Sequence, residues 1–265
     1  FKDTMSRSGS YMESKKPIPL HHEELPLRTP SGATVQREME FPENFFVIGT
    51  VNVDETTYMF SPKVLDRANV LEFRIGPEQA NAFLSQNGKL VTSAIPTVGA
   101  PLAFLDLSRR ARGLAHPSLA SPSDAALKEC RDSLKGFFDL LHPVRLEFAF
   151  RTINEITRYL HVDFELAASK SQWRWQDCLD AQVLQKILPK LHGSRRRLEP
   201  ILIALATYCE ARNLDAARKP LQRDAELNSY PATTAPSAVA FPLSRTKLLE
   251  MIEAVRRDQF VSFIQ

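Results

Sequence analysis

The chain has 265 residues, of which 43% are hydrophobic and 25% charged, and its formal net charge is +3. This length allows one large globular domain or two small ones with their own cores. The small net charge argues against a strongly electrostatic nucleic-acid-binding protein, although it leaves room for a local basic patch. The cysteines are far apart and form no CxxC pair (Cys130, Cys178 and Cys209). This pattern disfavours a disulfide framework and a zinc site and predicts a cytoplasmic location.

The chain contains 9 glycines, and no two of them are five positions apart. The phosphate-binding loop GxxxxGK[ST] is therefore absent, and so is GxGxxG. No apolar run approaches the ~20 residues of a membrane span, and no charged-then-apolar leader follows Phe1. We expect a piece of a longer protein, with the main phosphate cradle elsewhere.

The first part of the chain predicts the end of an α/β sheet. Residues 1–40 are polar and irregular, and we expect a loop there with at most a short hairpin. The continuous apolar run FFVIGTV (45–51) is typical of a central strand buried on both faces. SPKVLDRA (61–68) predicts a short helix opened by proline. NVLEFRI (69–75) alternates Val70, Glu72 and Arg74 with Leu71, Phe73 and Ile75, which predicts a second strand.

The remaining residues have helical patterns. Apolar positions recur every three or four residues, which predicts amphipathic helices, in segments 77–86, 124–142, 150–160, 179–191, 195–213 and 244–265. The Pro-, Ala- and Thr-rich run YPATTAPSAVAFP predicts a linker over residues 213–242. The expected fold is thus an α/β remnant followed by a mostly α-helical part.

Polar residues follow the first predicted strand, and they carry the functional prediction. NVDE could be the acidic end of a Walker B strand, but Gly49, Thr50 and Asn52 interrupt the apolar run too early. An amide at a strand end can donate to phosphate and accept from water at once, which suits the orientation of an attacking water molecule. We therefore favour a strand that places Asn52 near the terminal phosphate of a nucleotide.

The segment PENFFVIGTVNVDETTYMFSPKVLDRANVLEF (42–73) resembles the sensor-1 strand, following helix and last strand of the McrB-like branch of AAA+ NTPases. Asn52 matches the sensor-1 asparagine, and Glu55 matches the aspartate of the family pattern MNxxDRS. Thr56 stands where that pattern has arginine, and Val51 replaces its methionine. The resemblance implies a domain division into 1–76 (the end of the AAA+ core), 77–212 (a helical lid), 213–242 (a linker) and 243–265 (a C-terminal amphipathic helix).

The same resemblance implies roles for three arginines. Arg67 ends the helix after sensor 1, where the family has arginines that reach a neighbouring subunit's nucleotide; a surface pair with Asp66 or Glu72 is the alternative. A sensor-2 arginine is expected at the start of a lid helix, where the helix N-terminus also favours anions. The order of elements favours Arg151, and the local pattern GSRRR favours Arg196.

The resemblance also implies an activity. We expect a motor subunit that hydrolyses ATP or GTP with Mg²⁺ in a ring of identical subunits, a hexamer, and acts in DNA restriction or phage defence with DNA and a nuclease partner. The chain alone is expected to bind no nucleotide, because it lacks the phosphate loop. Two alternatives stay open: a helical protein-interaction scaffold, and a helical nucleic-acid-binding domain that uses Arg195–Arg197 with Trp173 and Trp175. We expect no metal site in the chain itself; His21 and His22 lack further ligands at metal spacing.

Overall fold

The computed structural model describes residues 4–5, 11–12, 17–22, 26–40, 47–51, 60–85, 102, 104–106, 125–167, 172–222, 227–230 and 239–263. The chain divides into two compact units. The first unit comprises residues 1–51 with 96–112, and the second comprises residues 52–95 with 113–265.

The first unit contains two short antiparallel strand pairs. β1 (Thr4–Met5) pairs with β2 (Tyr11–Met12), and β3 (Ile18–Pro19) pairs with β4 (Glu38–Met39). Between β3 and β4 in sequence, Arg28 and Thr34 form a further, isolated antiparallel bridge. The intervening turn contains Gly32 at φ 85°, a backbone conformation that glycine adopts without steric cost.

The strand predicted over residues 45–51 is wrong for the part that the structure describes. Residues 47–51 form neither helix nor strand. The side chains of Val47 and Ile48 are 82% and 91% exposed. A strand buried on both faces needs neighbouring strands and covering helices. Among the described residues, no strand pairs with this segment.

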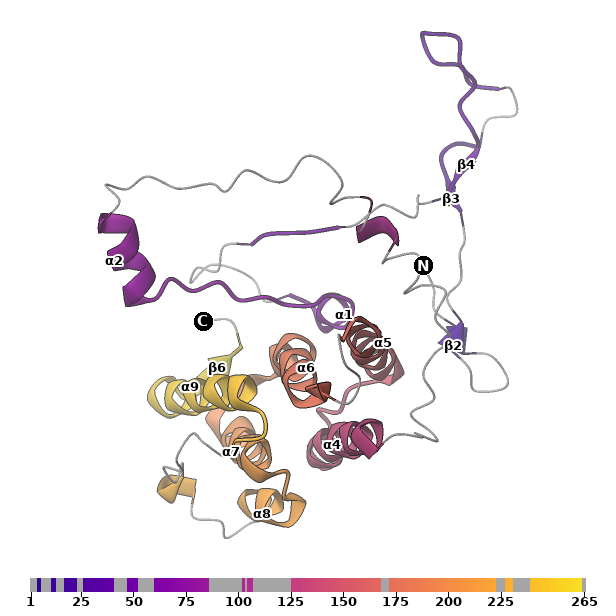
Figure 1. Ribbon diagram of the computed structural model, residues 1–265. Coiled ribbons are helices and arrows are strands. Elements are labelled where there is room, and N and C mark those ends of the chain that lie inside the picture. Colours follow the sequence, from indigo (N-terminus) through magenta and orange to yellow (C-terminus); the bar gives the residue numbers. More distant parts are fainter. Residues whose placement is uncertain are drawn as a thin grey trace. The chain divides into compact units, whose positions relative to one another are not determined.

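The second unit is mostly helical (Figure 1). Its α-helices, in chain order, are α1 (Pro62–Leu65), α2 (Pro77–Ser85), α4 (Ala125–Leu141), α5 (Phe150–Leu166), α6 (Trp175–Gln182), α7 (Arg195–Ala211), α8 (Leu214–Arg218) and α9 (Pro242–Asp258). Shorter turns are η1 (His142–Val144), the π-helical η3 (Val183–Ile187), η4 (Leu188–Lys190), η5 (Lys219–Leu221) and η6 (Leu227–Ser229). The helices predicted from apolar periodicity are thus confirmed, with shifted ends.

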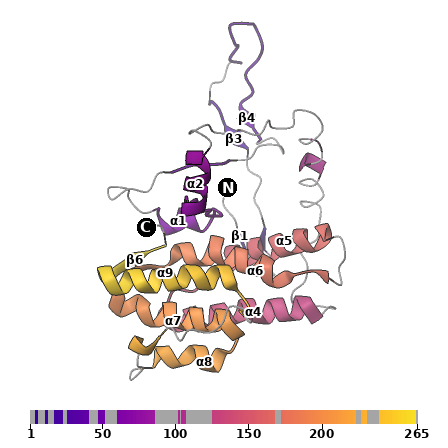
Figure 2. The same cartoon turned by 60° about the vertical axis from the view of Figure 1, so that its left-hand side comes forward.

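Helix α7 forms the centre of the core. Its side chains are buried around most of its circumference from Leu198 to Cys209. Such a helix must be covered on several sides. Helices α4, α8 and α9 all pack against it (Figure 2).

Near the C-terminus, the structure differs from one predicted helix (244–265) and from the predicted linker (213–242). Helix α9 ends at Asp258, because Gln259 adopts a left-handed conformation with φ 61°. The chain then forms β6 (Phe260–Ser262), which pairs antiparallel with β5 (His192–Ser194). In the segment predicted as a linker, α8 and η5 are helical, and Phe241 is fully buried in the core.

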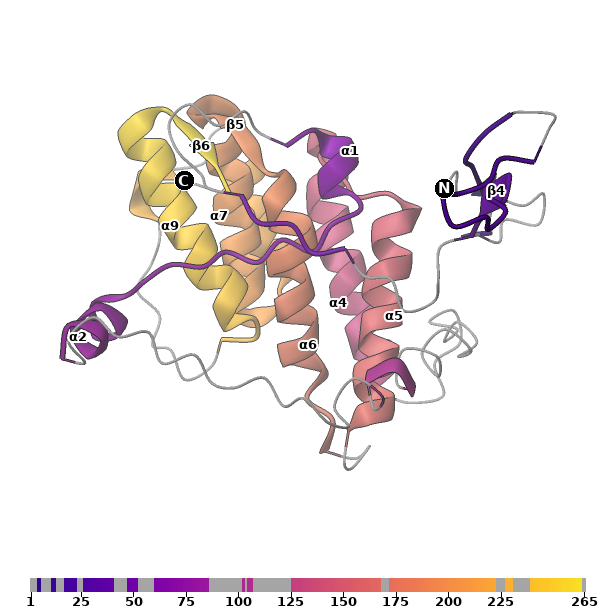
Figure 3. The ribbon, with the colours of Figure 1, turned by 90° about the horizontal axis from the view of Figure 1, so that it is seen from above.

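The strand predicted over residues 69–75 is also wrong, since these residues form no ladder. Its alternation nevertheless survives from Val70 to Phe73, whereas Arg74 is exposed. Val70 and Glu72 are partly buried against the helices, whereas Leu71, Phe73 and Ile75 are 60%, 92% and 83% exposed. We call residues 66–75 the docked segment, because it runs across the helical bundle from α1 toward α2 (Figure 3).

Candidate functional site

The predicted catalytic residues are only partly within the described structure. Asn52 and Glu55 lie outside the described residues. Arg67, Arg151 and Arg196 are described, and all belong to the second unit.

Arg67 lies exposed just after α1. Its Nη1 donates to the carbonyl of Lys63 at 2.7 Å. The two carboxylates that could have paired with it are bound elsewhere: Asp66 accepts from Lys190, and Glu72 accepts from Lys247. The guanidinium of Arg67 is therefore held near the end of α1 by a backbone carbonyl and not by a carboxylate of its own segment.

The docked segment is held to the helices by charged side chains at both ends. Lys190 Nζ binds the carboxylate of Asp66, and Lys247 Nζ donates to Glu72 at 2.5 Å. Arg74 adds an exposed bond to Glu250 at 3.2 Å. Because the two lysines are mostly buried, their pairs with the acidic side chains hold more firmly than pairs in open solvent.

A backbone hydrogen bond holds the middle of the docked segment, and a proline makes it available. Pro189 has no N–H, so it cannot donate to the carbonyl of Gln185 four residues earlier. The N–H of Leu188 donates to Val183 across the π-helical turn. The carbonyl of Gln185 instead accepts the N–H of Val70 at 3.0 Å.

Arg151 occupies the second position of α5, next to Thr152. The Thr152 side chain is fully buried, and its hydroxyl accepts from Lys190 Nζ at 2.8 Å. Lys190 thus touches the residue that precedes Arg67 and the residue that follows Arg151. The structure brings these two predicted site residues into one region of the helical unit.

Arg196 lies in a different set of contacts. It is exposed at the second position of α7, one turn from the strand pair β5–β6. Its neighbour Arg195 donates to Glu199, which also accepts from Arg256. Among the described residues, the hydrogen bonds and ion pairs that hold the docked segment come from η3, η4 and α9 and not from the start of α7.

The two tryptophans are buried and are not placed to stack on nucleic-acid bases. Trp173 Nε1 donates to Asp163 at 2.7 Å, and the ring packs edge-on against Phe164. Trp175 packs against Phe241 beneath the guanidinium of Arg212. The aromatic half of the nucleic-acid alternative is therefore wrong, because these rings anchor the core.

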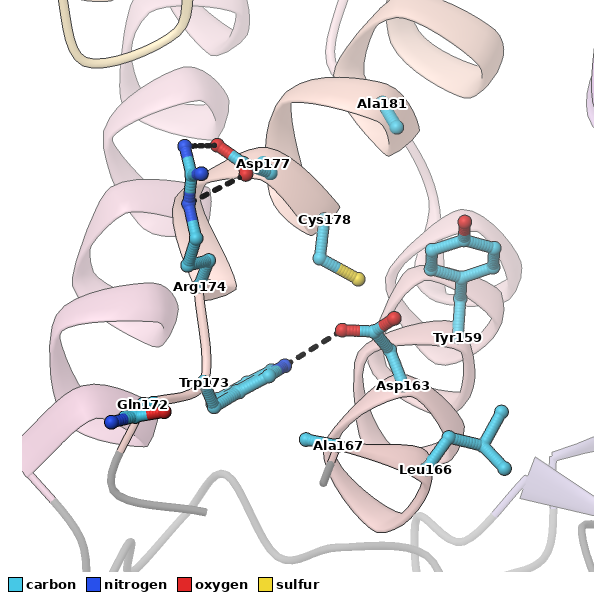
Figure 4. A pocket seen from close by; sticks show the side chains of 10 residues that line it. All are labelled: Tyr159, Asp163, Leu166, Ala167, Gln172, Trp173, Arg174, Asp177, Cys178 and Ala181. Carbon is cyan, nitrogen blue, oxygen red and sulfur yellow. Dashed lines mark hydrogen bonds and ion pairs between the residues drawn. The ribbon is translucent and has the colours of Figure 1, made fainter. Parts of the chain in front are cut away.

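A pocket of about 510 Å³ lies between α5 and α6, and sequence reasoning missed it (Figure 4). Its lining mixes polar and apolar side chains: Tyr159, Asp163, Leu166, Ala167, Gln172, Trp173, Arg174, Asp177, Cys178 and Ala181. Asp163 is engaged by Trp173, and Arg174 pairs with Asp177 at 2.9 Å. Burial raises the pKa of the Cys178 thiol well above its usual range, so this sulfur stays protonated and is a poor nucleophile. The lining supplies no activated catalytic group.

Across the described ranges, no group of three His, Cys, Asp or Glu side chains is arranged to hold a metal ion. The same residues contain no helix with the length and apolar character needed to cross a membrane.

The fold and contacts define a mostly helical domain that binds the docked segment through lysines paired with Asp66 and Glu72. Residues 106–260 match the model of a family described as a domain of unknown function, DUF8727. The match covers more than half of the chain, and the chain belongs to this family. No curated protein and no solved structure matched the chain.

Proposed function

We propose that this chain is the C-terminal portion of an AAA+ NTPase subunit similar to the McrB-like branch. The whole protein would hydrolyse ATP or GTP with Mg²⁺ in a ring of identical subunits, a hexamer, and act on DNA with a nuclease partner. The proposal rests on the motif in residues 42–73, which precedes the family match at 106–260.

The exposed face of the docked segment is the observation that carries the proposal. Leu71, Phe73 and Ile75 present large apolar side chains to water on the face turned away from the helices. Burying each of them would stabilise a protein by about 1.5–3 kcal/mol. The docked segment is extended and has one face on the helical domain and the other exposed to solvent. We expect this arrangement for an edge of a sheet whose other strands are absent. The AAA+ core supplies such a sheet.

The proposed chemistry uses positioned charges and dipoles. Asn52 would orient the attacking water. Glu55 would take the place of the aspartate in the family pattern, as the resemblance implies. Arg67 would stabilise transition-state charge on the nucleotide of a neighbouring subunit, because a guanidinium forks onto phosphate oxygens and stays protonated. Arg151 is favoured over Arg196 as the sensor-2 residue, because Lys190, which binds Asp66 of the docked segment, also donates to Thr152 beside Arg151.

Asn52→Ala in the protein that includes the upstream phosphate loop tests this proposal. Nucleotide affinity should stay near normal while kcat falls at least about 10-fold, because the amide acts on the water and not on nucleotide binding. The affinity is measured with a fluorescent nucleotide and kcat by phosphate release. Lost affinity with unchanged turnover per bound nucleotide would contradict the assignment.

Arg67→Ala gives the second arm of this experiment. It should reduce kcat by about 10³-fold in uniform rings. Activity should partly return in rings mixed with Asn52→Ala subunits. At some interfaces an intact Asn52 from one subunit then meets an intact Arg67 from its neighbour. No recovery on mixing would assign Arg67 a structural role.

A protein-interaction scaffold is the second candidate, and the same exposed row of Leu71, Phe73 and Ile75 favours it. The two candidates differ in what precedes the chain. A GxxxxGK[ST] motif followed by an apolar strand ending in Asp-Glu, encoded upstream, supports the NTPase. If the upstream sequence contains no such motif, the protein-interaction scaffold is supported.

A further inference from the structure

One lysine joins the two regions that contain the proposed phosphate-contacting arginines. Lys190 Nζ binds the carboxylate of Asp66 and donates to the hydroxyl of Thr152 at 2.8 Å. Asp66 is adjacent in sequence to Arg67, and Thr152 is adjacent to Arg151. The three contacting residues come from the docked segment, η4 and α5.

Lys190 lies in a largely buried environment, so the loss of its hydrogen-bonding partners would destabilise the fold. The Lys190 side chain is 16% exposed, and Thr152 is fully buried. An ammonium group taken largely out of water needs a carboxylate and hydrogen-bond acceptors to offset its desolvation. Asp66 supplies the carboxylate and Thr152 the hydroxyl acceptor, so both residues are held at the Lys190 ammonium group.

A second anchor lies on the other side of Arg67. The N–H of Val70 donates to Gln185, whose carbonyl is left without a helical donor by Pro189. Arg67 therefore lies between two fixed points, Asp66 and Val70, both held by residues of the turns η3 and η4. The family domain contains both turns.

We propose that Lys190 is a positioning residue that sets Arg67 relative to Arg151. This inference rests on the proposed function for the roles of the two arginines. Lys190 itself needs no contact with nucleotide. It acts by holding the end of α1 against the start of α5, so that the helical domain determines where the Arg67 guanidinium lies.

Lys190→Met in the full-length protein tests the inference, with Lys190→Arg and Lys128→Met beside it. Methionine keeps the length of the side chain and removes its charge. Lys128 is an exposed lysine of α4 and serves as the matched control. Nucleotide affinity should change less than about 2-fold in Lys190→Met, whereas kcat should fall at least about 10-fold, since misplacement of a catalytic group by about 1 Å has effects of this size. Lys190→Arg should retain most of the activity, and Lys128→Met should match the wild type.

Hydrogen exchange of the amides from Arg67 to Val70 gives a readout that does not depend on activity. In Lys190→Met these amides should exchange at least about 10-fold faster, because the segment opens locally. The double variant Asp66→Lys with Lys190→Asp should restore part of both protection and turnover, because the ion pair is reversed while the summed length of the two side chains is kept.

The two measurements separate the possible failures. If the wild-type full-length protein hydrolyses no nucleotide, the proposed function is overturned and, with it, the positioning role, whatever the exchange rates in Lys190→Met. Lost turnover with unchanged exchange would overturn the inference about Lys190 and leave the NTPase standing. Faster exchange with full turnover would also overturn the inference, because Lys190 would then be a structural contact only.

Discussion

At the residue scale, Glu199 shows how a buried charge is made tolerable. Its side chain is 5% exposed and accepts from Arg195 at 2.7 Å and from Arg256 at 2.6 Å. Burial by itself raises the pKa of Glu199, but the hydrogen bonds and charges of the two guanidinium groups outweigh it, and the pKa lies below its ordinary value of 4.5. The folded protein therefore binds this proton less readily than the unfolded chain.

The sign of the pKa shift gives a pH prediction. Because the folded pKa of Glu199 is lowered, its contribution to stability is complete above the unfolded pKa and is lost as the pH falls through the folded pKa. Glu199→Gln should lower the free energy of unfolding at neutral pH by about 1–3 kcal/mol. The deficit should shrink below pH 4.5. Urea denaturation at neutral and acidic pH measures it.

Asp258→Asn is the control for this prediction. Asp258 also pairs with an arginine, Arg257, but both lie at the surface. Its substitution should leave the stability unchanged at either pH. A deficit in Glu199→Gln that is equal at neutral and acidic pH would contradict the assignment.

At the element scale, helix α9 begins without a cap of its own. Phe241 precedes it and offers no side-chain acceptor. The carboxylate of Asp180, from α6, instead accepts the N–H groups of Leu243 at 2.7 Å and Ser244 at 2.8 Å. A negative charge at this end also interacts favourably with the helix dipole. One buried side chain thus fixes the start of α9 against α6.

Asp180→Ala should therefore loosen one particular helix end. It leaves two N–H groups without their acceptor and should lower the free energy of unfolding by about 2–4 kcal/mol. Asp180→Asn keeps one acceptor oxygen and should cost less. Hydrogen exchange at Leu243 and Ser244 locates the effect, and denaturation measures its size. Unchanged exchange at these two amides would refute the capping role.

At the scale of the whole molecule, the bare face of the docked segment predicts two different outcomes for one substitution. Phe73 is 92% exposed in this chain, so Phe73→Ser should change its stability by less than about 0.5 kcal/mol. In the longer NTPase that we propose, the same side chain would be buried, and its replacement should lower the free energy of unfolding by about 3–5 kcal/mol. Denaturation of both proteins measures the difference.

Phe137→Ser is the matched comparison, because Phe137 is fully buried in the helical core of this chain. It should destabilise both proteins alike. If Phe73→Ser is harmless in the longer protein as well, no sheet covers the docked segment there and the proposed function loses its main support.

The helices could be predicted from the sequence because their signal is local. Apolar side chains every three or four residues define one face of a helix, and Pro62 and Pro77 mark first turns. The strands over 45–51 and 69–75 could not be predicted in the same way. A strand needs hydrogen-bonding partners from elsewhere, and an apolar or alternating run does not say whether they are present.

The sequence by itself determined that the chain is rich in amphipathic helices and that it contains no GxxxxGK[ST] motif. The nucleotide-sensing role of residues 42–73 stays a prediction. Only the tertiary structure decided that Lys190 meets Asp66, 124 residues away, and that Gln185 offers its carbonyl to Val70. It also decided that Trp173 and Trp175 are core anchors. Periodicity and short motifs act through neighbours along the chain, whereas ion pairs and burial depend on which distant residues the packed helices bring together.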